Sequence, residues 1–270
     1  MGERQNPFHW RGMVTDRSAF IGREQELTRI FTRLESLGCV SVVGERRIGK
    51  SSLLYQAWLR AQERLGSSCR PAFADLLSAK HHTLDGLLGA ILKGISEDER
   101  PLPEASAAEK LTAFEEAVRR VRSRGGVPVV FLDEFESLAA RTSEFGDDLL
   151  ESWRSLGNDG QMAFVASSAR PLDEVTQESG FTSSFYNIFA QMKLEEFTDK
   201  EAQAFAQRAA RLGRLEAGDD VFILRLGGQH PLRLQVAAWH VFDARRQGQV
   251  DYGLLQQRAE AEIAGMMKVQ

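Results

Sequence analysis

Short apolar runs alternate with amphipathic segments along the chain as far as about residue 197. Each run is four to seven residues long, and the segments between runs repeat apolar residues at helical spacing. The predicted strands cover residues 40–43, 70–75, 127–132, 162–166 and 188–194. Strands that alternate with helices form a parallel sheet covered on both faces, and such sheets bind ligands at the carboxyl ends of their strands. We therefore expect an α/β sandwich with a five-stranded parallel sheet.

The pattern changes at Thr198, beyond which no strand is predicted. Four later stretches have helical apolar spacing, and they cover residues 198–212, 218–226, 231–246 and 251–267. At the other end of the chain, residues 1–18 show no periodicity, so we expect an extended arm there. The predicted organisation is an arm (1–18), an α/β domain (19–196) and a small all-helical lid domain (197–270), with a hinge at 195–198.

Composition narrows the class of protein. The chain has 270 residues, of which 43% are hydrophobic, enough to bury a substantial core. Its formal net charge of −4 argues against a main role in neutralising nucleic-acid phosphate. Cys39 and Cys69 lack metal-ligand spacing and indicate buried, reduced thiols. Since the N-terminus is too polar for a signal peptide and no apolar run approaches a membrane span, we expect a cytoplasmic protein with no membrane partner.

The most specific motif follows the first predicted strand. Gly44, Gly49, Lys50 and Ser51 fit the pattern GxxxxGK[ST], and a strand and an amphipathic helix flank them. A polyphosphate is held by inward backbone N–H groups, a helix N-terminus and one long cation. Lys50 is the predicted cation, and Ser51 is a predicted Mg²⁺ ligand. The residues predicted to line the phosphates are Gly44, Glu45, Arg46, Arg47, Ile48, Gly49, Lys50, Ser51 and Ser52.

A pair of acids at the end of the third predicted strand narrows the chemistry further. Asp133 is placed to hold Mg²⁺, and Glu134 to orient and activate an attacking water. Two acids could instead stand here because a helix dipole favours them, since a helix is expected to start near Phe135. With the phosphate loop upstream, the acidic pair favours an enzyme that hydrolyses a nucleoside triphosphate over a kinase. The chain has no Asn-Lys-x-Asp segment, which argues against a GTPase.

In this order, the motifs resemble those of the AAA+ superfamily, and more closely its STAND and archaeal-type ATPase branch. FIGREQEL is similar to the branch's N-terminal signature, GERRIGKSSLL to its Walker A motif, and VVFLDEFESL to its Walker B motif. FVASSAR stands where the family places sensor 1, and LGGQHPLRLQ resembles its lid motif. The resemblance covers nearly the whole chain and implies a P-loop NTPase fold that binds ATP or ADP with Mg²⁺.

The resemblance also implies how an adenine nucleotide is recognised. Ile21, Gly22 and Arg23 would flank the nucleoside, by position in the family's N-terminal signature. His230 and Pro231 would close over the base from the lid. Pro231 could equally serve as the first residue of a helix, a role compatible with binding.

Two further residues are implied at the terminal phosphate. Ser168, or its neighbour Ser167, would act as sensor 1, where many hydrolysing members have Asn or Thr. Arg170 would contact the terminal phosphate, and the alternative is an ordinary salt-bridged loop arginine. A serine at sensor 1 favours slow turnover.

The function expected first is therefore a Mg²⁺-dependent ATPase whose nucleotide state moves the lid and so controls association with a protein partner or with itself as a homo-oligomer. A second hypothesis is a slow or non-hydrolysing ADP/ATP switch of signalling or defence type. A third is a DNA-remodelling or DNA-loading ATPase, and the acidic net charge counts against this nucleic-acid partner.

Overall fold

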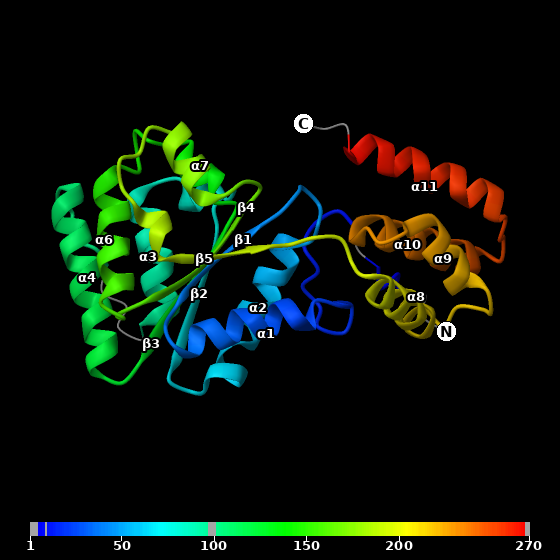
Figure 1. The fold of residues 1–270 in the computed structure, drawn as a ribbon, viewed down its shortest axis with the longest axis horizontal. Helices are drawn as coiled ribbons and strands as arrows, with labels where there is room; N and C mark the ends of the chain where they lie inside the picture. The colour runs from blue at the N-terminus through cyan, green and yellow to red at the C-terminus, as the bar shows by residue number, and fades with distance from the viewer. Residues whose placement is uncertain (1–4, 9, 97–100, 268–270) are drawn as a thin grey trace. The chain divides into compact units, whose positions relative to one another are not determined.

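The computed structural model describes residues 5–8, 10–96 and 101–267, which form two compact units (Figure 1). The sheet unit comprises Glu24–Glu45 and Leu53–Leu194. The lid unit comprises the described residues up to Arg23, Arg46–Ser52, and those from Glu195 onward. These units group residues by packing, whereas the predicted division into 1–18, 19–196 and 197–270 follows chain order and stays a prediction.

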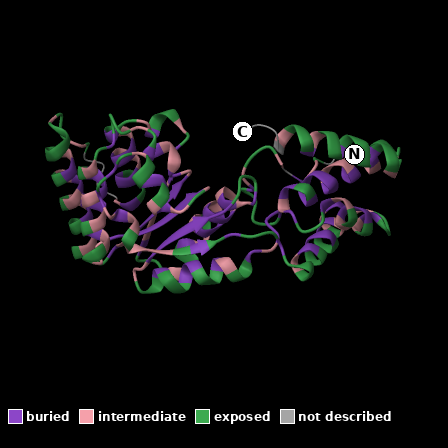
Figure 2. Cartoon of the chain, turned by 45° about the horizontal axis from the view of Figure 1, so that its top comes forward, coloured by how far each residue is buried: buried purple, intermediate pink, exposed green. Residues whose placement is uncertain are grey.

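A parallel five-stranded sheet forms the centre of the sheet unit and confirms the predicted fold class. Its strand order is β2-β3-β4-β1-β5. The strands are β1 (Cys39–Val43), β2 (Cys69–Asp75), β3 (Val127–Asp133), β4 (Ala163–Ser168) and β5 (Phe189–Lys193). The three central strands are buried on both faces, as Figure 2 shows, which is why their sequences are continuous apolar runs rather than alternating ones.

Helices cover both faces of this sheet. They are α1 (Glu24–Glu35), α2 (Lys50–Leu65), α3 (Leu84–Ile95), α4 (Ala107–Ser123), α5 (Glu136–Ala139), α6 (Asp147–Asn158) and α7 (Leu172–Glu178), with the 3₁₀ turns η1 (Ala79–His81) and η2 (Phe185–Ile188). Figure 1 shows α3, α4 and α6 on the face opposite α1 and α2. Thr83 caps α3, because its side chain accepts the Gly86 N–H. Ser106 and Glu109 form a capping box that starts α4.

Side chains of α2 cover part of the edge strand β2. Trp58 Nε1 donates to the carbonyl of Pro71 over 3.3 Å, and Gln62 Nε2 donates to the carbonyl of Cys69 over 3.3 Å. Both carbonyls point away from β3. The nitrogen of Pro71, which carries no hydrogen, therefore also faces the open edge of β2.

The two cysteines are free and lie in strands of the sheet unit. Burial raises the pKa of each thiol to about 11. At neutral pH both are therefore protonated and unreactive, in keeping with their packing in the core.

The lid unit contains four helices close to the predicted ranges: α8 (Asp199–Gly213), α9 (Asp219–Gly227), α10 (Pro231–Gln247) and α11 (Tyr252–Met267). The arm adds apolar side chains to this unit. Phe8 is buried edge-on against Phe242, and Trp10 packs edge-on against Trp239. The amide of Asn6 donates to the Trp239 carbonyl over 3.1 Å.

A buried ion cluster joins three of the lid helices. Asp219, which is 0% exposed, accepts a two-pronged contact from Arg245 at 2.9 and 3.0 Å. It also accepts the Tyr252 hydroxyl at 2.7 Å and the Glu216 N–H at 2.9 Å. Each carboxylate oxygen thus has two donors, so the cost of burying the charge is offset by full hydrogen bonding.

Among the described residues, no helix has both the length and the apolar composition that crossing a membrane requires.

Candidate functional site

The glycine-rich loop leaves β1 at the carboxyl edge of the sheet. The Gly44 N–H donates to the Ser168 carbonyl over 3.2 Å, which fixes the start of the loop against β4. Gly49 has φ +102°, a conformation that disfavours any residue with a Cβ. Helix α2 then begins at Lys50, so the first N–H groups of α2 lie at a helix N-terminus, where anions are favoured. Lys50 itself is only 5% exposed, which is unusual for a lysine, and its contact with a polyphosphate stays a prediction.

The two acids predicted to serve hydrolysis end β3 at the same edge. Asp133 is 3% exposed, and its Oδ1 accepts the Ser167 hydroxyl over 2.5 Å. The Glu134 N–H donates to the same hydroxyl over 3.0 Å. Glu134 has φ +59°, which is left-handed and unfavourable for a residue with a side chain of this size. A buried carboxylate on one strand and a second, partly exposed one beside it fit a hard cation and an activated water.

The structure separates the two serines considered for sensor 1. Ser167 contacts the acidic pair, whereas the Ser168 hydroxyl donates to the Arg170 carbonyl over 2.6 Å and closes a turn. The geometry therefore favours Ser167 over Ser168 as the polar group nearest the acids. A role for either serine at a terminal phosphate stays a prediction.

Arg170 forms a salt bridge, which is the alternative to phosphate contact that its sequence position left open. Its Nη1 lies 2.5 Å from Glu178 Oε1, and the arginine side chain is 48% exposed. This ion pair raises the pKa of Arg170 and lowers that of Glu178. Contact of Arg170 with a phosphate stays a prediction and would require this pair to separate.

Arg23 braces the glycine-rich loop from within the lid unit. Its guanidinium is buried, stacks 4.5 Å from the centre of the Phe197 ring, and donates to the carbonyls of Ile48 (3.2 Å) and Glu195 (2.6 Å). Gly22 is positive in φ, and a Cβ there would come within 3.0 Å of Phe197. The Arg23 side chain thus has one main-chain partner in the loop, Ile48, and another at Glu195. Sequence reasoning missed this role. Contact of Arg23 with a nucleoside stays a prediction.

The remaining predicted residues lie in caps and turns of the lid unit. His230 is buried and precedes α10, where its Nδ1 accepts the Leu232 N–H over 3.2 Å. Pro231 is the first residue of α10, a position that suits its fixed φ. Ile21 is buried in the same apolar cluster as Phe197. Their contact with a base is a prediction that these structural roles permit.

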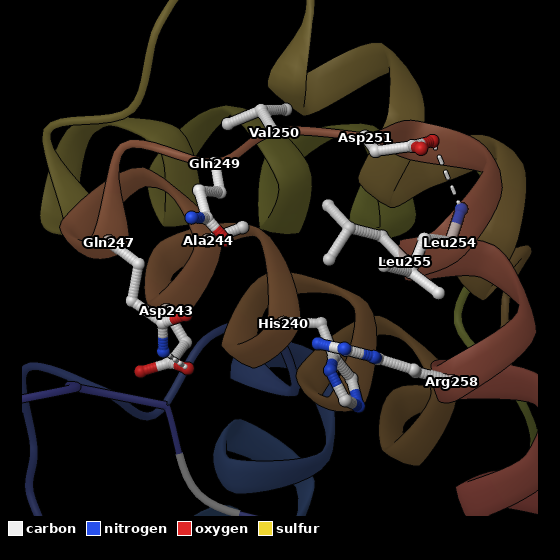
Figure 3. Close-up of a pocket in the computed structure, with 10 residues that line it drawn as sticks. All are labelled: His240, Asp243, Ala244, Gln247, Gln249, Val250, Asp251, Leu254, Leu255 and Arg258. Carbon is white, nitrogen blue, oxygen red and sulfur yellow. Dashed lines mark hydrogen bonds between the residues drawn. The ribbon is translucent and has the colours of Figure 1, made fainter.

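A hollow of about 260 Å³ lies between α10 and α11 (Figure 3), and none of the predicted site residues lines it. Its acidic side chains serve the local fold. The Asp251 carboxylate caps α11 by accepting the Gly253 and Leu254 N–H groups at 2.9 and 3.1 Å. Asp243 accepts from Arg246 and Gln247 on its own helix. Its polar lining therefore does not identify a ligand.

Residues that could hold a metal are few. In the part of the chain that the structure describes, no group of three or more His, Cys, Asp or Glu side chains has the geometry of a metal site. The predicted holding of Mg²⁺ by Asp133 and Ser51 stays a prediction, and it requires few protein ligands because Mg²⁺ commonly binds through one or two carboxylates with phosphates and water.

Comparisons with known proteins agree with this arrangement. The family model described as AAA ATPase domain matches residues 19–165. A Walker-type ATPase of Pyrococcus abyssi has a TM-score of 0.68 at 19% identity, covering 95% of this chain and 76% of that one. The ORC2 protein of Aeropyrum pernix, solved with ADPNP and ADP, has a TM-score of 0.70 at 15% identity, covering 95% and 71%.

A third solved structure is the Aeropyrum pernix ORC1 protein in complex with DNA, with a TM-score of 0.60 at 19% identity, covering 90% of this chain and 66% of that one. At such identities these likenesses show the fold alone. No curated protein matches the chain. Since the matched family model spans more than half of the 270 residues and the sheet has the strand order described above, the chain belongs to the AAA+ P-loop ATPases.

Proposed function

We propose that this AAA+ protein binds ATP with Mg²⁺ and hydrolyses it slowly, and that the bound nucleotide controls association with a protein partner or with a second copy. The observation that carries the proposal is the convergence of two motifs on one sheet edge. The glycine-rich loop starts at Gly44 beside Ser168, and the acidic pair begins at Asp133 beside Ser167. Neighbouring residues of β4 thus hold the starts of both motifs.

Each residue has a distinct role in this proposal. Lys50 and the N–H groups of the loop hold the β- and γ-phosphates, and Ser51 and Asp133 hold Mg²⁺. Glu134 accepts a proton from the attacking water. Bound Mg²⁺ would neutralise charge that develops on the phosphate oxygens. The serine at the end of β4, where many hydrolysing relatives have Asn or Thr, supports slow turnover and a switch of STAND type.

Two substitutions test the proposal directly. Lys50→Ala should weaken ATP binding by about 100-fold, since a charge-assisted contact contributes 1.5–3 kcal/mol. Lys80→Ala, at an exposed lysine of the sheet unit, is the matched control and should bind as the wild type does. Glu134→Gln should keep ATP binding and lose phosphate release. Equal ATP affinity of the Lys50 variant and the wild type, measured by calorimetry, would contradict the proposal.

The same experiment separates an ATPase from a holding switch. If the wild type binds ATP but releases phosphate no faster than Glu134→Gln, the chain is a nucleotide-bound switch without significant hydrolysis.

A DNA-dependent function is a second candidate, because the ORC1 neighbour was solved in complex with DNA. The expectation that nucleic acid is an unlikely, though not excluded, partner therefore has no support from the comparisons. Fluorescence anisotropy with duplex DNA at 50 and 200 mM salt tests this candidate. Binding that falls steeply with salt favours it, because phosphate contacts release counterions, and no binding at low salt excludes it.

A further inference from the structure

We propose that Ser167 is a positioning residue for Mg²⁺-dependent hydrolysis, acting through the acidic pair rather than on the nucleotide itself. The inference rests on the proposed function, because it concerns how Asp133 and Glu134 are held for the metal and the water. It assigns a role to a hydroxyl that the motif pattern does not specify, and it separates that role from those of Ser168 and Arg170.

The first step is the hydrogen bonding of one hydroxyl. A serine hydroxyl has one hydrogen to donate and two lone pairs to accept. Ser167 gives its hydrogen to Asp133 Oδ1 over 2.5 Å and accepts the Glu134 N–H over 3.0 Å. Ser167 is 0% exposed, so water does not compete for these bonds. The same oxygen thus orients the carboxylate of one acid and the peptide of the next.

The second step is the backbone that this contact maintains. Glu134 has φ +59°, and a conformation of this kind persists only where its surroundings hold it. Besides the bond to Glu134, Ser167 accepts the Phe135 N–H at its carbonyl over 2.9 Å, and the Glu136 carboxylate accepts the Ala169 N–H. Ser167 and Ala169 therefore bond to three successive residues of the turn after Asp133, namely Glu134, Phe135 and Glu136.

The third step is a comparison with the neighbouring serine. Successive side chains of a strand point to opposite faces of the sheet. The Ser168 hydroxyl accordingly donates to the Arg170 carbonyl, while Ser167 faces Asp133 on the adjacent strand. The control for Ser167→Ala is Ser152→Ala, at a buried serine of α6 outside the motifs whose hydroxyl also donates to a carboxylate, that of Glu115, over 2.7 Å.

A metal ligand that loses its supporting hydrogen bond is less well oriented. Removing such a partner typically lowers metal affinity or activity by about 10- to 100-fold. We expect Ser167→Ala to raise the Mg²⁺ concentration needed for half-maximal ATP affinity by about that factor, and to slow any Glu134-dependent phosphate release to a similar degree. Affinity for ATP in EDTA should not change. Ser152→Ala should behave as the wild type in all three measurements.

A readout without nucleotide comes from amide hydrogen exchange of the ligand-free protein. Ser167→Ala should speed exchange at Glu134 and Phe135, whereas Ser152→Ala should not. Ser167→Thr keeps a hydroxyl and should restore slow exchange and Mg²⁺ dependence. Ser167→Cys keeps the size with a weaker donor, so it replaces the alanine variant if that variant does not fold, with the same expected losses.

Two results would overturn the inference. One is wild-type Mg²⁺ dependence in Ser167→Ala. The other is a loss of ATP affinity in EDTA equal to the loss with Mg²⁺, since that would be general damage to the site. Failure of the proposed function has a different signature. Wild type and Lys50→Ala would then bind ATP with equal affinity, and that result does not depend on any variant of Ser167.

Discussion

The two units each bury an aspartate, and the two aspartates are held in opposite ways. Asp219 in the lid unit receives an arginine fork, a tyrosine hydroxyl and a main-chain N–H, all within hydrogen-bond distance. Asp133 in the sheet unit receives the neutral hydroxyl of Ser167 at the end of a strand. The first arrangement pairs the carboxylate with a cation inside the fold, and the second includes a hydroxyl that orients one carboxylate oxygen.

Burial of an acid is therefore a poor guide to function unless its partners are considered. A carboxylate paired with a fixed arginine fastens helices together. A carboxylate oriented by a hydroxyl at a sheet edge retains a geometry suited to a metal ion. This contrast predicts that substitutions at Asp219 act on stability and substitutions at Asp133 act on catalysis.

The largest expected effect is loss of the lid's ion cluster. Asp219→Ala removes the fully buried partner of Arg245 and leaves this partly exposed arginine with Glu216, so the loss should lie near the low end of the about 3–5 kcal/mol that breaking a buried pair typically costs. Urea unfolding measures the change, and hydrogen exchange should locate it in α9, α10 and α11. Asp220→Ala, at the less buried neighbour, is the control and should stay within about 0.5 kcal/mol of wild type. A similar small change for Asp219→Ala would remove the proposed contrast.

Asp133→Asn tests the other side of the comparison. Asparagine keeps the size of the side chain and its amide oxygen can still accept from Ser167, so the free energy of unfolding should change less than in Asp219→Ala. Phosphate release should fall by on the order of 100-fold or more, since bound metal contributes several kcal/mol to such reactions. Parallel urea unfolding and phosphate-release assays check both halves. A variant that is strongly destabilised yet active would reverse the assignment.

Alkaline pH should act on the sheet unit through its two thiols. Burial raises the folded pKa of Cys39 and Cys69 from the ordinary 9.0 to about 11, so the protonated thiols favour the folded state. This contribution is fully present below pH 9 and is lost as the pH rises through 11, by on the order of 1 kcal/mol per thiol at pH 10. Cys39→Ala should lose less stability between pH 8 and 10 than wild type does. Parallel losses in the two proteins would show that other groups titrate.

The smallest expected effect compares matched caps in the two units. Thr198 with Glu201 starts α8 in the lid unit, and Ser106 with Glu109 starts α4 in the sheet unit. Replacing either cap by Ala should cost about 1 kcal/mol. Hydrogen exchange should place each loss in its own unit. If Thr198→Ala speeds exchange equally throughout α4, the units do not respond separately.

Much of the fold was predictable because its signals are local. Central strands buried on both faces stand out as apolar runs, and the phosphate-loop motif has a nearly fixed spacing. The four lid helices follow from periodicity and from caps such as Thr198. These features depend on residues close together in sequence, so a single chain is enough to read them.

The details of the site depend on contacts that sequence does not display. The choice between Ser167 and Ser168 is a choice of sheet face, which a shift of one residue reverses. Arg23 reaches the carbonyl of Glu195 across 172 positions in the chain. Phe8 enters the lid core from a segment with no periodicity, because an extended arm contributes isolated side chains rather than a repeating face. From the sequence alone, a polar residue such as Arg23 is predicted to bind a ligand, because its main-chain partners are visible only in the structure.

The covered edge of β2 bears on how this chain behaves when crowded. An open strand edge is a template on which another chain can add a strand, and such growth leads to aggregates. Here Trp58 and Gln62 occupy outward carbonyls, and Pro71 supplies no outward hydrogen. The first half of that edge is thus closed to templated growth. A second copy that approaches this half of the edge therefore meets side chains, which can be specific, rather than free backbone groups.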